Sequence, residues 1–315
     1  MWLVIGGGQG LAIIQMEMIT RWGMGFRICA MKNIPVRQIK AAPKEANVSE
    51  GFSIRDVRHL LAGKDMVQEL HRHDFFYVLA LKKGAGHHEI DFTRYKVCDH
   101  AVFLMRPGQV HQHTLKAGST GYLVEFSPDF YRPRDKASRQ PLRKAMATNL
   151  HSLDATRFNK LLPLLTYIFQ EYTDKQEGHG EVIKANLGIF FIELVRQNSK
   201  AASNNANTYA QERLEDFLEL LEKHIAQHKQ VAQYSDMLNL SPYQLNAITK
   251  ATLGKTCSEL INAHIILESK RYLLATSNQV NQVAYYLGYE DVSYFIRFFK
   301  KHTGYSPEAF RHNFR

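Results

Sequence analysis

The chain has 315 residues, a formal net charge of +10 and an isoelectric point near 9.4. This length is enough for two domains that each bury a core, so we expect two functions joined in tandem. The apolar fraction is 45%, the mean hydropathy is −0.32, and no apolar run approaches the ~20 residues that a membrane helix needs. Three dispersed cysteines fit neither a disulfide framework nor a CxxC zinc site, so we expect a soluble protein of the reducing cytoplasm. The basic balance favours a polyanionic partner, although net charge alone indicates only non-specific attraction.

Residues 1–45 show no pattern that we can assign to a folded domain. The early glycines do not form a dinucleotide-binding turn, because with Gly6 and Gly8 in its first two positions the third falls on Leu11. A secretory signal is not favoured either, because the segment lacks a basic start followed by a small-residue cleavage site. We interpret residues 1–45 as a disordered leader, or as a mis-assigned start if translation begins at Met31.

Residues 46–150 alternate short apolar stretches with turn residues. The stretches are "FFYVLALKKGAGHHEIDF", "HAVFLMRPGQVHQHTL" and "GYLVEFS". The segments 82–86 and 106–109 carry the glycine and proline that are typical of hairpin and corner turns. Several short strands at this spacing predict a small β-barrel or jelly roll.

Two amphipathic segments follow, at 154–173 and 180–197, with apolar residues at three- and four-residue intervals. They are too apolar to stand alone in water, so they pack on the barrel, on each other or on a second subunit. We predict that residues 151–200 are dimerisation helices. The polar tract "NSKAASNNANT" then predicts a linker at 201–210 and a domain boundary.

The last segment, 211–315, has helical periodicity and contains an internal repeat. Residues 234–260 align with residues 283–310, with one extra residue in the second copy. The matched pairs are Leu238 with Leu287, Leu245 with Phe295, Lys250 with Lys300, Gly254 with Gly304, and Leu260 with Phe310. Each copy has the short helix, tight turn and second helix of a helix-turn-helix motif.

Capping residues predict where two of these helices begin. Ser241 with Gln244 forms a capping box at the start of the second helix of the first copy. Thr256 with Glu259 starts a long helix over about 257–275, which joins the two copies and fixes their separation.

The second helix of each copy has one face for the core and one for solvent. Leu245 and Ile248 are expected to point inward in the first copy, and Phe295, Phe298 and Phe299 in the second. A recognition helix reads base edges with its N-terminal half and touches phosphates at its ends. We therefore predict these DNA-binding residues: Tyr243, Gln244, Asn246, Ala247, Lys250, Val292, Ser293, Tyr294, Arg297, Lys300 and Lys301.

Their chemistry separates base readers from phosphate contacts. Arg297 is the best candidate for bidentate reading of guanine, and Asn246 or Gln244 for adenine. Lys300 and Lys301 suit phosphates, where they position the helix without specifying a sequence.

The stretch "QVNQVAYYLGYEDVSYFIRFFKKHTGYSPEAFR" resembles the signature of AraC/XylS-type transcription regulators. The resemblance is carried by Ala284 to Tyr289, Ser293 to Pro307, and Phe310–Arg311. It implies a seven-helix DNA-binding domain whose two recognition helices enter successive segments of the major groove. The first copy departs from the family pattern, because Ala247 stands where relatives usually have arginine. We expect the second helix to carry the larger share of specificity.

The N-terminal half contains a second resemblance. His71-x-His73 on one expected strand, and a Pro-Gly pair followed by His111 on a later one, resemble the two halves of a cupin barrel. In metal-binding cupins a glutamate falls four residues after the second histidine, and here that position is Tyr77. The three histidines could still form a site for zinc, nickel or iron, but a phenol replaces the carboxylate poorly.

The sensor domains of AraC-type regulators resemble the same barrel without its metal. That resemblance implies that His71, His73, Tyr77 and His111 line or brace an effector pocket, although some of them could simply satisfy backbone groups. We expect a small polar effector such as a sugar or carboxylate, no metal, and no other cofactor. The remaining histidines of this region are expected at the surface or at strand ends: His87, His88, His100 and His113.

We therefore predict an α+β protein, with a cupin-like β-barrel at 46–150, flanking helices, and an all-α domain at 211–315 that carries two helix-turn-helix motifs. Its predicted function is that of a sequence-specific DNA-binding regulator, not an enzyme, which responds to a small-molecule effector in the barrel. Its expected partners are promoter DNA, the effector, a second copy of the chain, and RNA polymerase if it is an activator. The alternative is a metal-dependent cupin enzyme fused to a DNA-binding domain.

Overall fold

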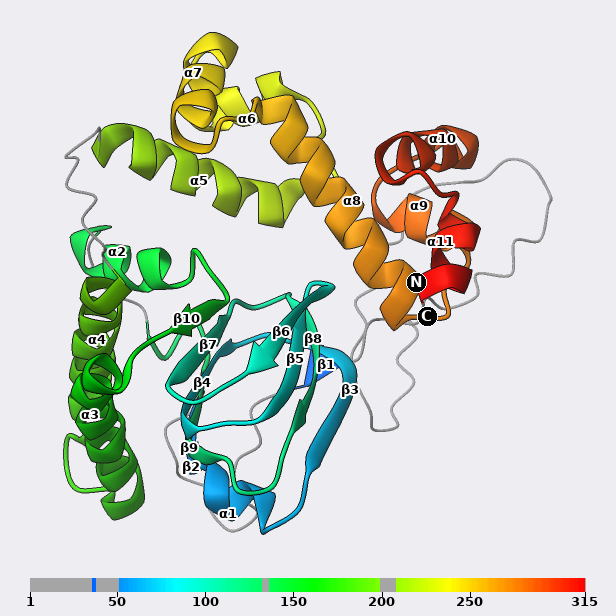
Figure 1. Ribbon diagram of the computed structural model, residues 1–315. Coiled ribbons are helices and arrows are strands. Elements are labelled where there is room, and N and C mark those ends of the chain that lie inside the picture. Colours follow the sequence, from blue (N-terminus) through cyan, green and yellow to red (C-terminus); the bar gives the residue numbers. More distant parts are fainter. Residues whose placement is uncertain (1–35, 38–50, 132–135, 199–207, 315) are drawn as a thin grey trace, which may run out of the picture. The chain divides into compact units, whose positions relative to one another are not determined.

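The computed structural model describes residues 36–37, 51–131, 136–198 and 208–314, all within the compact unit Lys32–Arg315 (Figure 1). The rest of the predicted leader, and residues 201–207 of the predicted linker, lie outside the described residues. Helix α5 (Thr208–His224) already begins within the segment that the sequence predicted as linker.

Two five-stranded sheets form the N-terminal domain. The first has the order β1-β3-β8-β5-β6 and the second the order β10-β7-β4-β9-β2. The strands are β1 (Val36–Arg37), β2 (Phe52–Asp56), β3 (Met66–His73), β4 (Phe76–Lys83), β5 (Gly86–Ile90), β6 (Thr93–Val97), β7 (Ala101–Met105), β8 (Val110–Leu115), β9 (Thr120–Phe126) and β10 (Leu150–Ser152). Strand β1 lies in the predicted leader and pairs in parallel with β3.

Alternation along the strands divides the apolar residues between two cores, because successive side chains of a strand point to opposite faces. In β4, Tyr77 and Leu79 belong to the core between the sheets, which they share with Ile90 of the first sheet. Val78 and Ala80 point the other way and contact the helices that cover the second sheet. The predicted barrel is therefore confirmed as a two-sheet β-structure.

Helices α2 (Lys136–Ala145), α3 (Ala155–Asp174) and α4 (His179–Asn198) cover that outer face (Figure 1). Phe158 of α3 and Phe191 of α4 are fully buried there. The two amphipathic segments predicted from the sequence are confirmed as α3 and α4, and they pack on the sheet and on each other. A short helix, α1 (Val57–Leu61), follows β2.

The C-terminal domain consists of α5 and six further helices among the described residues, as the family resemblance implied. These are α6 (Val231–Met237), α7 (Pro242–Leu253), α8 (Cys257–Ala275), α9 (Val280–Tyr286), α10 (Val292–Thr303) and α11 (Pro307–Phe314). Both predicted capping boxes are present, with Ser241 accepting from the backbone N–H of Gln244 and Thr256 from that of Glu259. The long helix α8 joins the two helix-turn-helix motifs, α6–α7 and α9–α10, as predicted.

Both helix-turn-helix turns pass through a residue with positive φ. The first turn has Asn239 at φ 53°, and the second has Gly288 at φ 72°. A Cβ atom on Gly288 would lie 1.8 Å from the carbonyl oxygen of Ala226, so only glycine fits the second turn. Among the described residues, no helix combines the length and apolar character that crossing a membrane requires.

Candidate DNA interface and histidine cluster

Helix α7 presents the first recognition surface. Leu245 and Ile248 are buried, as predicted, and they orient the opposite side of the helix toward solvent. Tyr243 is 83% exposed at the first turn, where a recognition helix contacts bases. The other predicted contacts that are exposed on α7 are Gln244, Ala247 and Lys250.

Asn246 differs from the other predicted contacts on α7, because both ends of its side-chain amide are used within the domain. Its Nδ2 donates to the carbonyl of Pro242 at 3.0 Å, and its Oδ1 accepts from the backbone N–H of Cys257 at 3.0 Å. Asn246 therefore fixes the start of α8 against α7, and of the two proposed adenine readers Gln244 is the more accessible one.

Helix α10 presents the second recognition surface, with Phe295 and Phe299 fully buried beneath it. Phe298, which the sequence placed inward, is only half-buried and lies against the ring of His302 at 4.6 Å. The exposed predicted contacts are Ser293, Tyr294, Arg297, Lys300 and Lys301, whereas Val292 is half-buried.

Arg297 has the freedom that base reading requires. Its side chain is 68% exposed, and it forms a long ion pair of 3.7 Å with the similarly exposed Asp291. An exposed pair of this kind contributes little to stability, so a nucleic acid can replace it at small cost. The lysines in the last turn of α10 add positive charge at the end of the helix that we predicted to contact phosphates.

Five histidines lie inside the barrel on three neighbouring strands of the first sheet. Residues two apart on a strand face the same side of the sheet. The five histidines are His71 and His73 on β3, His111 and His113 on β8, and His88 on β5. The register places His71 opposite His111, and His88 opposite His113. All five side chains are buried, with exposures from 0% to 5%.

The prediction for two of these histidines was wrong. His88 and His113 were expected at the surface or at strand ends, but they are buried in the barrel. His113 lies two residues after His111 on the same strand, so its inward orientation could have been predicted from that spacing. The inward position of His88 depends on the pairing of β5 with β8, which the sequence does not show. His87, which alternates with His88, is exposed as expected.

The ring nitrogens of this cluster are within hydrogen-bonding distance. The Nε2 atom of His111 lies 2.7 Å from Nε2 of His73 and 3.1 Å from Nε2 of His71. Its Nδ1 atom lies 2.8 Å from Nε2 of His88. Burial, reinforced by the other histidines, lowers the pKa of His88 and the pKa of His111 well below the ordinary imidazole value. Both rings are therefore neutral at pH 7.

Tyr77 lies beside the cluster, with its ring stacked on His73 at 5.6 Å. Its hydroxyl is buried and has no hydrogen-bond partner among the described residues. Burial and the charge of Glu125 raise the pKa of Tyr77. Glu125 is opposite Tyr77 in the β4–β9 register and is held by Arg55 at 2.7 Å. The four predicted effector residues are thus close together inside the barrel.

The β5–β6 turn contacts α8 through a buried ion pair that the sequence did not predict. Both turn residues, Asp91 and Phe92, have positive φ, at 46° and 65°. Asp91 accepts two hydrogen bonds from Arg271 of α8, at 2.8 and 2.7 Å. It also accepts from Gln109 at 2.8 Å. Arg271 is only 7% exposed, so this pair is largely withdrawn from solvent.

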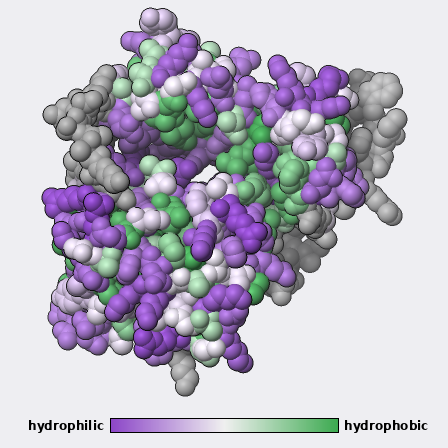
Figure 2. All heavy atoms as spheres, in the orientation of Figure 1, coloured by the Kyte–Doolittle hydropathy of each residue, from purple (hydrophilic) through white to green (hydrophobic). Residues whose placement is uncertain are grey.

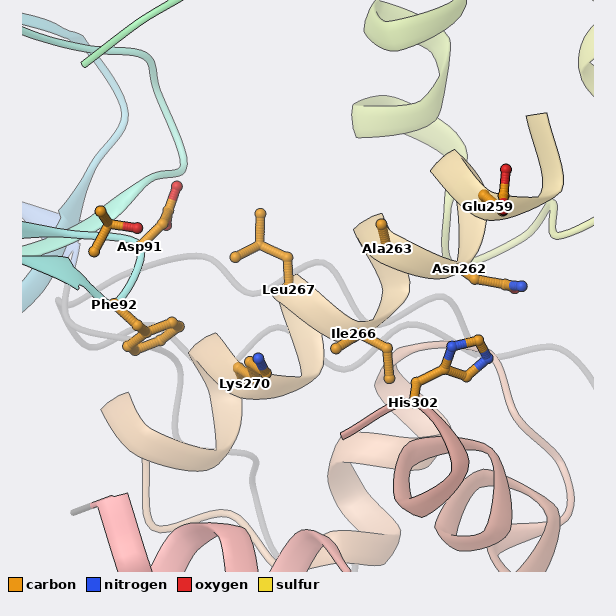
Figure 3. A pocket seen from close by; sticks show the side chains of 10 residues that line it. Asp91, Phe92, Glu259, Asn262, Ala263, Ile266, Leu267, Lys270 and His302 are labelled. Atoms are coloured by element: carbon orange, nitrogen blue, oxygen red, sulfur yellow. The ribbon is translucent and has the colours of Figure 1, made fainter. Parts of the chain in front are cut away.

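A cleft of about 540 Å³ lies beside this contact. Figure 3 shows Asp91 and Phe92 on one side, Leu267 and Lys270 of α8 facing them, and His302 of α10 at the other end. The visible face of the molecule in Figure 2 is mainly hydrophilic, with smaller apolar areas between the polar ones. The cleft borders both the sensor sheet and a recognition helix.

The fold and these two sites define a DNA-binding transcription regulator that has a separate ligand-binding domain. The model of the AraC-like ligand-binding domain matches residues 62–142, and that of a helix-turn-helix domain matches residues 234–313. The chain belongs to the AraC family of transcriptional regulators.

Several curated proteins are similar to the chain. The HTH-type transcriptional activator RhaS of Escherichia fergusonii is 25% identical over 255 residues, which are 76% of this chain and 86% of RhaS. The activator RhaR of Mannheimia succiniciproducens is 24% identical over 255 residues, which are 78% of this chain and 87% of RhaR. The bifunctional transcriptional activator/DNA repair enzyme AdaA of Bacillus subtilis is 30% identical over 93 residues, covering 30% of this chain and 44% of AdaA.

Among solved structures, fatty-acid-bound ToxT from Vibrio cholerae is 16% identical, with a TM-score of 0.40, and covers 85% of this chain and 97% of its own. The C-terminal domain of the response regulator AraT from Geobacillus stearothermophilus is 26% identical, with a TM-score of 0.31. That match covers 32% of this chain and 84% of the AraT chain.

Proposed function

We propose that this chain is a cytoplasmic, sequence-specific transcription regulator that acts as a homodimer. Helices α7 and α10 of each copy contact the promoter DNA. The observation that carries the proposal is the pair of recognition helices, each with a buried core face and an exposed polar face, joined by the single helix α8. Such a pair can contact two successive segments of the major groove, and a dimer doubles the number of half-sites.

The sign of regulation is proposed from the relatives. RhaS and RhaR are named as transcriptional activators. We infer the same direction for this chain, with RNA polymerase as the partner at the promoter. An enzymatic role for the barrel is not favoured, because the family matched there is a ligand-binding domain.

The barrel is the proposed sensor, with His71, His73, Tyr77 and His111 as its effector-binding residues. The first sheet carries histidines on its inner face and contacts to the C-terminal helices on its outer face. On β8, His111 points inward while the adjacent Val110 packs in the core of the C-terminal helices. On β3, Arg72, between two of the histidines, lies over the ring of Tyr272 of α8 at 5.9 Å.

This arrangement gives a physical route for control. A ligand that moves β3 or β8 changes the contacts of α8, because the same strands form both surfaces. Control further requires that the ligand bind one arrangement of the domains more tightly than another. The buried pair of Asp91 with Arg271 is the contact that we expect to differ between the two arrangements.

The test is selection of genomic DNA fragments by the purified full-length chain. We expect recovery of a recurring motif whose half-sites are about 10 base pairs apart, or a multiple of that spacing. Recovery of fragments with no shared motif would contradict sequence-specific binding. Repeating the selection with cell extract shows whether a small molecule alters recovery.

A further inference from the structure

Three imidazole nitrogens from β3 and β8 lie close together inside the sensor barrel. The Nε2 atoms of His71 and His73 each lie close to Nε2 of His111, at 3.1 and 2.7 Å. The ligand atoms of all three residues lie within 4.8 Å of one another, and all three side chains are buried. The three rings come from two neighbouring strands, which hold them firmly in place.

Contacts behind two of the rings bear on which nitrogens carry protons. Nδ1 of His71 lies 2.6 Å from the carbonyl oxygen of Glu69. A carbonyl only accepts, so this Nδ1 carries the proton, and the Nε2 of a neutral His71 presents a lone pair. Nδ1 of His111 lies 2.8 Å from Nε2 of His88, which can accept its proton in the same way.

Nε2 of His111 is within hydrogen-bonding distance of Nε2 of both His71 and His73, so the three nitrogens already lie close enough to share one ligand. A cation at the point of convergence would satisfy all three lone pairs together.

We propose that His71, His73 and His111 bind a divalent first-row transition-metal ion, with Zn²⁺ as the representative, through their Nε2 atoms. His88 is then the outer partner that holds His111 in the metal-binding tautomer, as the carbonyl of Glu69 does for His71. This assignment rests on the proposed sensor role and names a metal ion as the ligand of the barrel. It replaces the sequence-based expectation of a metal-free barrel.

The donor set and its dimensions fit such an ion. Three neutral imidazoles suit zinc and its neighbours, and leave one position open for water or another ligand. Zinc–nitrogen bonds of 2.0–2.1 Å at tetrahedral angles place ligand nitrogens about 3.3 Å apart. The 3.1 Å separation of His111 and His71 is within about 0.2 Å of this value, and the 2.7 Å separation of His111 and His73 requires those two rings to open by about 0.6 Å. The buried Tyr77 hydroxyl is a further polar atom beside the site.

A second histidine triad, of His88, His111 and His113, shares His111 with the first. In this triad Nδ1 of His111 lies 2.8 Å from Nε2 of His88, a contact similar to those within the first triad. The first triad has backbone support for its tautomer and is therefore the one that we assign. Under this assignment His113 is dispensable for the ion.

The test is the metal content of the full-length chain, measured by inductively coupled plasma mass spectrometry after incubation with Zn²⁺ and removal of unbound ion. We expect one Zn²⁺ per chain in the wild type. His87→Ala is the matched control, because this exposed histidine of β5 lies next to His88 but outside the cluster, and it should keep the ion. The double variant His71→Ala/His73→Ala should lose it. His88→Ala should weaken Zn²⁺ affinity about 10–100-fold, as expected for an outer partner.

A second measurement uses the wild-type chain alone, since removal of two buried histidines can unfold the barrel. Co²⁺ added to chelator-treated protein should give visible absorption bands that saturate at one ion per chain. A wild type that binds neither Zn²⁺ nor Co²⁺ overturns the proposal, and so does a folded double variant that keeps the ion. Neither readout involves DNA, so failure of DNA binding would refute only the proposed function.

Discussion

We predict that sequence reading by α10 depends most on Arg297. Its side chain is exposed and its ion pair with Asp291 is long, so replacement by alanine should leave the fold intact. We expect Arg297→Ala to weaken binding to the selected operator by about 1–3 kcal/mol and to relax base choice at one position. Fluorescence anisotropy on operators that differ at single base pairs measures both effects.

Lys300→Ala is the control for that substitution. We predict that Lys300 contacts a phosphate, so its loss should weaken binding to all DNA sequences alike. It should also reduce the slope of log affinity against log salt concentration by about one. If Arg297→Ala leaves both affinity and base preference unchanged, the proposed register of α10 in the groove is wrong.

We expect Asn246 to stabilise the domain and not to read bases. Its removal leaves the backbone N–H of Cys257 without its acceptor, so Asn246→Ala should lower the free energy of unfolding by about 1–3 kcal/mol. Base preference should stay the same, whereas Gln244→Ala should alter preference and should lower stability by about 0.5–1.5 kcal/mol, because its Oε1 accepts from the backbone N–H of Ser241. Urea unfolding together with operator binding tests this. Unchanged stability with a lost adenine preference would restore the adenine-reading role predicted from the sequence.

The link between the β5–β6 turn and α8 is the feature of the fold that is hardest to predict from the sequence. Asp91 and Arg271 are 180 residues apart, and no local pattern joins them. Removal of Arg271 leaves the buried Asp91 without its cation, so Arg271→Ala should destabilise the protein by about 3–5 kcal/mol. Asp91→Ala should cost less, because Arg271 keeps its ion pair with Glu268. A double-mutant cycle should give a coupling energy of about 0.5–3 kcal/mol.

The exposed pair of Lys116 with Asp65 is a matched control, because it has the same 2.7 Å separation but side chains that are 54% and 41% exposed. Its coupling energy should not exceed about 1 kcal/mol. Additive effects at Asp91 and Arg271 would remove this pair from the proposed route between sensor and recognition helices.

The helices themselves were predictable because their signals are local. Capping boxes at Ser241 and Thr256 and the repeat of buried residues, such as Leu245 with Phe295, are visible in the sequence and recur in the structure. The barrel interior was predicted only in part. His71 and His111 could be matched to a known motif, whereas burial of His88 depends on strand pairing, which sequence periodicity does not specify.

Dimerisation of the chain through α3 and α4 stays a prediction. Helix α4 exposes Ile189 and Ile192, three residues apart, at 47% and 38%. If this face joins two copies, Ile189→Glu/Ile192→Glu should convert a dimer into a monomer without unfolding the chain, because a buried charge destabilises the interface. Light scattering after size-exclusion chromatography gives the mass.

The matched control for that variant is Val67→Glu, which changes another exposed apolar residue, 69% accessible on β3. It should leave the mass of the dimer unchanged. A monomeric wild type, or a dimer that survives the double substitution, would show that another surface joins the copies.

Recognition of a particular DNA sequence is the property on which the proposed function of this chain depends. The most direct measurement is the ratio of its affinities for the selected operator and for a scrambled duplex of equal length and composition, at one physiological salt concentration. Specific regulators bind their site at least about 10³-fold more tightly than other DNA, and we predict a ratio of that order. Equal affinity for the two duplexes would contradict the account.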